Sequence, residues 1–195
     1  MIFSLGWAIY YGDGDASAII KAILICEILG WPSWYFTRGV RELSLRNAFL
    51  IVTLGWVTVA ALGALPYILS GAIPNFTDAF FESISGFTTT GSSILGNPET
   101  LPNLPNGIES LPRGVLFWRS FTHWIGGMGI VVFGLALLPM IGAGGVQLYR
   151  AEVTGPLPAR LGARVRVTAK ALATVYLSLT AGLALLLVLG GMNLF

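Results

Sequence analysis

Charged residues are scarce in this sequence. Of its 195 residues, 10% are charged and 55% are hydrophobic, and the mean hydropathy is +0.78. A typical soluble domain is about 25% charged, so this composition excludes one. Two long runs, 47–77 and 171–195, carry no charge at all, and 120–149 has only His123 and Tyr149 as ionisable groups. Each run exceeds the ~20 residues that cross a hydrocarbon core, which predicts an all-α integral membrane protein.

Cysteine and histidine are nearly absent. The one cysteine, Cys26, lies in an apolar stretch and leaves no partner for an intrachain disulfide. The one histidine, His123, lies on a different predicted span. Intramembrane hydrolases need a nucleophile with a base, or several metal ligands, around one cavity. The sequence therefore argues against an enzyme and predicts no tightly bound cofactor.

The few charges are segregated by loop. Lysine and arginine concentrate in 37–47 and 150–170, whereas 66–113 is mainly acidic. Cytoplasmic loops are enriched in Lys and Arg, so we expect a multi-pass protein with both basic loops inside the cell. The net charge of +2 says little about partners, because the charges are segregated rather than pooled. As an integral membrane protein, the chain is expected to contact membrane lipid and no nucleic acid. Four spans are expected after a short apolar stretch, 1–11, that ends in a turn; they lie near 16–36, 47–70, 114–141 and 171–190.

The segment 66–113 interrupts these spans with a pattern that suits neither a span nor an exterior loop. A short amphipathic stretch runs from Asn75 into Gly86 and is followed by Thr-Thr-Thr-Gly. Ten helical residues reach about 15 Å, half of the ~30 Å hydrocarbon core. Non-helical backbone at membrane depth is tolerated only where protein packs around it or water lines it. The pattern therefore predicts a helix–re-entrant pore loop–helix repeat, as in K⁺ channels, flanked by transmembrane helices.

The residues of this loop suit a cation. Asn75 or Thr77 can cap the short helix, and Asp78 lies in its first turn, where negative charge is favourable. The other end of the helix carries partial negative charge and would point toward an ion. By itself Thr-Thr-Thr-Gly also fits a polar turn, but its position after a half-length helix favours an ion filter. In such a filter successive backbone carbonyls replace the hydration shell of the ion; here they belong to Thr88, Thr89, Thr90 and Gly91.

Two polar residues of the next span are further candidates. Arg119 and His123 are four residues apart and share a helix face. They either line the ion path or pair with Glu82. The alternative is that they lie near the outer interface and make local hydrogen bonds only.

Three ordered motifs resemble the Trk/Ktr/HKT superfamily of potassium transporters. The stretch 78–91, DAFFESISGFTTTG, is similar to the first pore loop of that family, and 117–129, FWRSFTHWIGGMG, to the helix after it. The stretch 144–152, GGVQLYRAE, with Gly155 and Pro156, resembles the cytoplasmic connection that follows. The residues before 47 resemble the Trk branch, which has an extra N-terminal helix pair.

The resemblance implies K⁺ transport across a prokaryotic inner membrane, with K⁺ as the transported ion. It also implies a homodimeric membrane subunit and a cytosolic, nucleotide-binding regulatory subunit. By position in the family motif, the carbonyls of Thr89 and Thr90 hold dehydrated K⁺, with Thr88 and Gly91 beside them. The residues that would support the loop are Asp78, Glu82, Gly86 and Ser92.

The family folds as four helix–pore loop–helix repeats around one pore, and this chain has room for fewer. We assign 1–46 to an N-terminal helix pair whose first helix is clipped and 47–149 to the first repeat. Residues 150–195 are assigned to a basic cytoplasmic connection and the first helix of the next repeat. One filter strand cannot surround an ion, so we expect the N-terminal portion of a transport subunit. The alternatives are a truncated non-conducting fragment, or a single-repeat unit that assembles into an oligomeric cation channel.

If 66–113 re-enters the membrane from outside, Asn103 is accessible outside the cell. We expect Asn103→Cys, on a Cys26→Ser background, to react with a membrane-impermeant thiol reagent in intact cells. Cysteines placed in 37–47 or 150–170 should react only after the cells are opened, since Lys- and Arg-rich loops lie in the cytoplasm. Labelling of position 103 in opened cells alone would contradict the re-entrant loop.

Overall fold

All regular secondary structure in the described part of the chain is helical. The computed structural model describes residues 1–38, 45–96, 101, 104, 106–141 and 158–192, and no strand occurs in these ranges. The chain divides into two compact units, Met1–Gly127 and Met128–Phe195. The elements are α1 (Ile2–Tyr11), α2 (Ala16–Thr37), α3 (Leu45–Gly63), α4 (Leu65–Leu69), α5 (Phe76–Phe87), the 3₁₀ turn η1 (Gly107–Ser110), α6 (Arg113–Ile141) and α8 (Pro158–Leu189).

Three segments of the described chain are long and apolar enough to cross a membrane: Ala16–Thr37, Phe49–Leu69 and Val167–Leu189. They agree with the expected spans near 16–36, 47–70 and 171–190, and α6 is a helix where the remaining span was expected. α8 begins at Pro158, well before 171, because proline is favoured at a first helical position and the Ala, Arg and Leu after it are good helix formers. These helices agree with the all-α membrane protein that the composition predicts.

The second expected span is broken near its end. α3 stops at Gly63 and α4 starts at Leu65. Pro66 has no N–H to donate to the carbonyl four residues earlier, and the Gly63 carbonyl accepts from the indole nitrogen of Trp118 on α6, 2.9 Å away. The carbonyl that the break leaves free at the end of α3 therefore binds α6.

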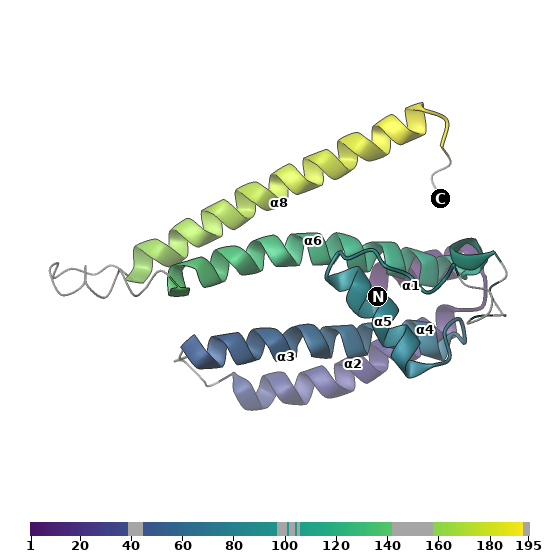
Figure 1. Cartoon of the computed structure of the whole chain (residues 1–195), viewed down its shortest axis with the longest axis horizontal. Helices are drawn as coiled ribbons and strands as arrows, with labels where there is room; N and C mark the ends of the chain where they lie inside the picture. Colours follow the sequence, from purple (N-terminus) through teal and green to yellow (C-terminus); the bar gives the residue numbers. More distant parts are fainter. Residues whose placement is uncertain (39–44, 97–100, 102–103, 105, 142–157, 193–195) are drawn as a thin grey trace, which may run out of the picture. The chain divides into compact units, whose positions relative to one another are not determined.

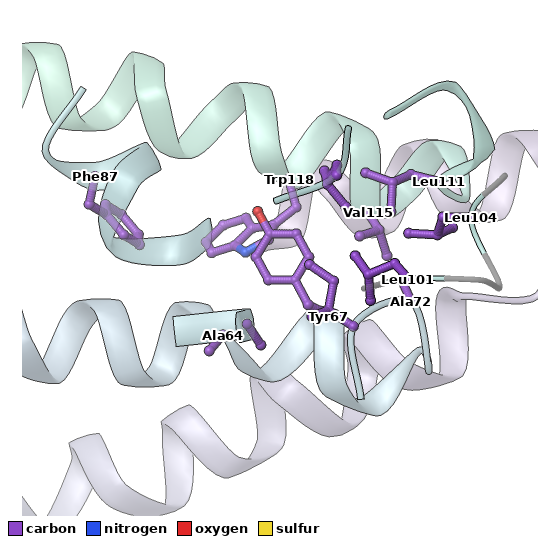
Figure 2. Packing of buried hydrophobic residues seen from close by; sticks show 12 residues of the cluster. Ala64, Tyr67, Ala72, Phe87, Leu101, Leu104, Leu111, Val115 and Trp118 are labelled. Atoms are coloured by element: carbon purple, nitrogen blue, oxygen red, sulfur yellow. The ribbon is translucent and has the colours of Figure 1, made fainter. Parts of the chain in front are cut away.

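The core of the first unit lies where α4 and the start of α6 meet. Tyr67 and Val115 are fully buried, and Trp118 is 5% exposed. Figure 2 shows the Tyr67 ring with side chains of α6 and of the preceding stretch around it. Burial of each large apolar side chain contributes about 1.5–3 kcal/mol, so this cluster holds the described leucines that precede α6 in place. Its leucines are Leu95, Leu101, Leu104 and Leu111.

The short helix α5 lies between α3 and α6 (Figure 1). Glycines permit the close approach. A Cβ at Gly86 would collide with the Thr122 hydroxyl, and a Cβ at Gly126 would collide with the backbone oxygen of Phe87. On α3, a Cβ at Gly63 would lie 2.6 Å from a side-chain carbon of Phe87. The position of α5 therefore depends on small residues in both neighbouring helices.

Replacing Gly126 by alanine should push α6 away from α5. Overpacking costs about 1–3 kcal/mol, more than the roughly 0.5–1 kcal/mol by which alanine is favoured over glycine in a helix. Gly55→Ala on α3 is the matched control, because nothing lies within 4 Å of its Cβ position. In thermal unfolding of the protein in detergent, Gly126→Ala should lower the Tm and Gly55→Ala should not. An unchanged Tm for Gly126→Ala would contradict the close contact of α5 and α6.

Candidate functional site

α5 starts as the sequence predicts. The side chain of the N-cap Asn75 accepts a hydrogen bond from the Thr77 N–H at 2.8 Å, and Asp78 lies in the first turn. Among the described residues Asp78 has no hydrogen-bond or ion-pair partner, so it acts through its favourable charge at the helix start. The helix has 12 residues. At 1.5 Å per residue this is about 18 Å, too short to cross a hydrocarbon core.

α5 ends in a strained turn. The Thr90 N–H donates to the Ser85 carbonyl and the Thr89 N–H to the Gly86 carbonyl, both at 3.0 Å. This pair of bonds is a Schellman motif, in which glycine usually takes the left-handed position. Here Thr89 takes it, with a φ of 57°. A β-branched residue in that region is a genuine outlier and costs about 1–3 kcal/mol, and such strain concentrates at functional sites.

The stretch 90–93 that follows is exposed and has no regular secondary structure. At one end the Thr88 carbonyl accepts the Thr89 hydroxyl at 2.7 Å. At the other end the Ser92 carbonyl accepts the Ser85 hydroxyl at 2.6 Å. Between them lie three carbonyls that accept no hydrogen bond from the part of the chain that is described; they belong to Thr89, Thr90 and Gly91. Two of these three are the predicted principal ion ligands.

A buried carboxylate fixes the far end of this stretch. Glu82 on α5 is 1% exposed. Its oxygens accept from the Ser93 hydroxyl at 3.0 and 3.1 Å and from the Ile94 N–H at 3.3 Å. The Arg119 Nε on α6 donates to the same carboxylate at 2.6 Å. Of the roles that the sequence left open for Arg119, the ion pair with Glu82 is the one that forms.

His123 makes a local hydrogen bond. It lies one turn beyond Arg119 on α6, and its Nδ1 is 2.9 Å from the Arg119 carbonyl. The same nitrogen lies 3.5 Å from the position of a Cβ on Gly86. His123 therefore makes a local hydrogen bond beside the last turns of α5.

Three contributors to this site were not predicted from the sequence. Ser85 binds the Ser92 carbonyl, Ser93 binds Glu82, and Thr122 packs against α5 while donating to the Arg119 carbonyl at 2.7 Å. A signal existed for Ser85, because it lies three residues after Glu82 and so on the same helix face. The position of Ser93 depends on the backbone path of 88–93, which has no regular secondary structure and which no local sequence pattern predicts.

One family model and several relatives match most of the chain. The family model described as TrkH, cation transport protein, matches residues 15–191. The Trk system potassium uptake protein TrkH of Escherichia coli (strain K12) is 43% identical over 192 residues, which are 96% of this chain and 38% of that protein. TrkH of Vibrio parahaemolyticus is 40% identical and TrkG of Escherichia coli (strain K12) is 31% identical, each over 96% of this chain and 37% of the relative. The chain thus spans little more than a third of the length of these relatives.

Glu82 and Arg119 should depend on each other for stability. Removing one partner leaves the other charge buried and unpaired, at a cost of about 3–5 kcal/mol, so Glu82→Gln and Arg119→Met should each lower the Tm in detergent. The Glu82→Gln/Arg119→Met double variant should lose less than the sum of the two. Asp78→Asn is the control and should cost about 1 kcal/mol or less. Additive losses in the double variant would refute direct coupling.

Proposed function

Because the chain belongs to the TrkH family of cation transport proteins, we propose that it forms part of the ion path of a K⁺ uptake transporter. The observation that carries the proposal is the set of exposed carbonyls at Thr89, Thr90 and Gly91, which accept no hydrogen bond from the described residues. Oxygens of this kind replace the hydration shell of K⁺ in selective filters. The relatives are named as potassium uptake proteins, so K⁺ is the proposed ion.

In this proposal α5 is the pore helix of a re-entrant loop and 88–93 is the filter strand. The loop enters from outside the cell, and the chain returns through 94–112 to α6. Thr89 and Thr90 supply the principal carbonyl ligands, with Thr88 and Gly91 beside them. The Thr88 carbonyl is the weakest of the four ligands, because it already accepts the Thr89 hydroxyl. The C-terminal end of α5 adds partial negative charge near the cation.

Glu82 and Arg119 support the filter and do not bind the ion. Glu82 binds both Ser93 and the Ile94 N–H, so it sets where the strand ends. Ser92 is tied to α5 through its carbonyl, and Gly86 lets α6 approach the same turn. The stretch is therefore held by α5, while the carbonyls of Thr89, Thr90 and Gly91 accept no hydrogen bond from the described residues.

A single strand covers one side of an ion, so further strands complete the path. We assign 1–46 to an N-terminal helix pair, 47–149 to the first repeat, and 150–195 to a connection and the first helix of the next repeat. Since the chain spans 38% of the Escherichia coli relative, we favour a longer protein that supplies the other repeats. An oligomer of single-repeat units is the alternative, and a fragment that conducts nothing is the outcome if neither forms.

The proposed setting is a prokaryotic inner membrane, crossed several times by a homodimeric subunit. The relatives are named as parts of a Trk system, which supports a further component, and we propose a cytosolic nucleotide-binding regulatory subunit. Its docking surface would include the basic stretch 150–170. Residues 150–157 of that stretch lie outside the described residues, and 158–170 begin α8.

Gly91→Ser should lower K⁺ uptake several-fold or shift uptake toward Na⁺. Gly91 has a φ of +79° and nothing within 4 Å of its Cβ position, so serine strains the backbone by about 1–2 kcal/mol without crowding the described chain. Gly71→Ser is the matched control, since Gly71 has a φ of +75° and the same open space. Thr90→Ser should be mild, because it keeps the hydroxyl that lies 2.8 Å from the Thr88 hydroxyl.

The assay measures K⁺ and Na⁺ uptake by the full gene product in a bacterial strain that lacks its own K⁺ uptake systems. Protein levels are matched by immunoblot. If the unmodified protein restores no uptake, the transport proposal fails. If it does restore uptake but both Gly91→Ser and Gly91→Asp leave flux and selectivity unchanged, the filter lies elsewhere in the protein.

A further inference from the structure

The turn between α1 and α2 contacts the start of α6 across 100 positions of the chain. The Arg113 N–H donates to Asp13 Oδ2 at 2.9 Å, and the Val115 N–H donates to Asp15 Oδ2 at 2.9 Å. The Arg113 guanidinium also lies 3.6 Å from Asp13 Oδ1. Two carboxylates of one turn thus bind the first turn of α6.

α6 has no side-chain cap of its own. Its first intrahelical bond runs from the Leu116 N–H to the Pro112 carbonyl, which makes Pro112 the N-cap. Proline has no side-chain acceptor, and the first N–H groups of a helix have no partner within the helix. Aspartate is among the best capping residues, and its charge is favourable at this end. Asp13 and Asp15 therefore supply from a distant segment the caps that the local sequence lacks.

The contact is tight and buried. Ser4 on α1 donates its hydroxyl to the Gly114 carbonyl at 2.5 Å, and Ser4 and Asp15 are 0% and 3% exposed. A Cβ at Gly114 would lie 2.6 Å from the Ala8 Cβ and 3.0 Å from the Ile19 Cδ1. Residues of α1, of the turn and of α2 thus meet α6 at one point, which only glycine permits.

Asp15 is buried at a free-energy cost. Its Oδ1 has no hydrogen-bond partner among the residues described. Burial raises the pKa of the Asp15 carboxyl, although the bond from Val115 acts in the opposite direction. A polar atom buried without a partner destabilises the fold. Asp15 therefore contributes its position against α6 more than it contributes net stability.

The position of the first turn of α6 affects the proposed ion-binding loop, residues 88–93. Arg119, which binds Glu82, follows Val115 by four residues, about 6 Å along the helix axis. Thr122 and Gly126 then pack against α5. A shift or rotation of the first turn of α6 therefore moves the residues that hold α5 and the 88–93 stretch.

We propose that Asp15, assisted by Asp13, is a positioning residue that fixes the start of α6 and through it the geometry of the ion-binding loop. The contact itself is independent of transport. Its effect on ions rests on the proposed function. The N-terminal helix pair thereby has a defined task, since α1 and α2 present the two carboxylates to α6.

Amide hydrogen exchange of the unmodified, purified full gene product tests the contact. The amides of Arg113 and Val115 should exchange roughly tenfold more slowly than the first-turn amides of α2, which starts without a side-chain cap. Equal exchange rates would overturn the proposal, whether or not the protein transports K⁺. This measurement also decides the matter if a variant fails to accumulate.

Uptake kinetics test the consequence for ions. Asp15→Ala should raise the KM for K⁺ several-fold and change the ratio of Rb⁺ to K⁺ uptake at matched protein level. Asp15→Asn keeps an acceptor for the Val115 N–H and should stay within about twofold of the unmodified protein, because Asn and Asp cap equally well. Glu109→Ala is the control, an exposed carboxylate in η1 without a hydrogen bond or ion pair to the described residues.

A loss of protein without a change in KM or ion ratio would reduce Asp15 to a folding role and overturn the proposal. The same holds if Asp15→Asn is impaired as strongly as Asp15→Ala. If the unmodified protein takes up no K⁺, the proposed function fails by itself, and the exchange rates still decide whether Asp15 positions α6.

Discussion

The site depends on the buried carboxylate of Glu82, where three parts of the chain meet. Its oxygens accept hydrogen bonds from the Arg119 guanidinium of α6, and from the Ser93 hydroxyl and the Ile94 N–H in the non-helical stretch that follows α5. Burying an ion pair requires that both charges lose water, so such a pair contributes little net stability compared with apolar residues of the same size. What it provides is one arrangement of α5, α6 and the strand, because any other leaves a charge buried and unpaired.

The contacts of Glu82 support a backbone conformation that is strained by itself. Thr89 holds a left-handed conformation that a β-branched residue normally avoids. The Schellman bonds at the end of α5 and the Ser85–Ser92 bond hold the strand on both sides of the strained residue. The carbonyls of Thr89, Thr90 and Gly91 in between accept no hydrogen bond from the described chain, and in the proposed function they bind the ion. A firmly held backbone with unbonded carbonyl oxygens is what dehydration of a cation requires, since the oxygens must replace water without relaxing toward other donors.

The sequence predicts those parts of the fold that follow from local rules. The apolar runs, the half-length helix and the turn after α1 were all expected, and Asn75 is one of the two caps that the sequence offered, because length, periodicity and capping act within a few residues. The pairing of Arg119 with Glu82 was one of several open roles, since spacing on a helix gives a face and not a partner. The bonds between the carboxylates of Asp13 and Asp15 and α6 link segments 100 residues apart, and no local sequence pattern predicts them. The assignment of Thr89 and Thr90 as ligands came from the family motif and stays a prediction, because hydrogen bonds within the chain do not identify an ion ligand.

The most direct test of the proposed ion site is to locate the ion itself. Crystals of the full gene product grown in Rb⁺ or Tl⁺ would show these ions by anomalous scattering. We expect an anomalous peak within coordination distance of the Thr89 and Thr90 carbonyl oxygens. A protein that transports Rb⁺ but has its peak elsewhere, with these two oxygens hydrogen-bonded to other parts of the protein, would contradict it.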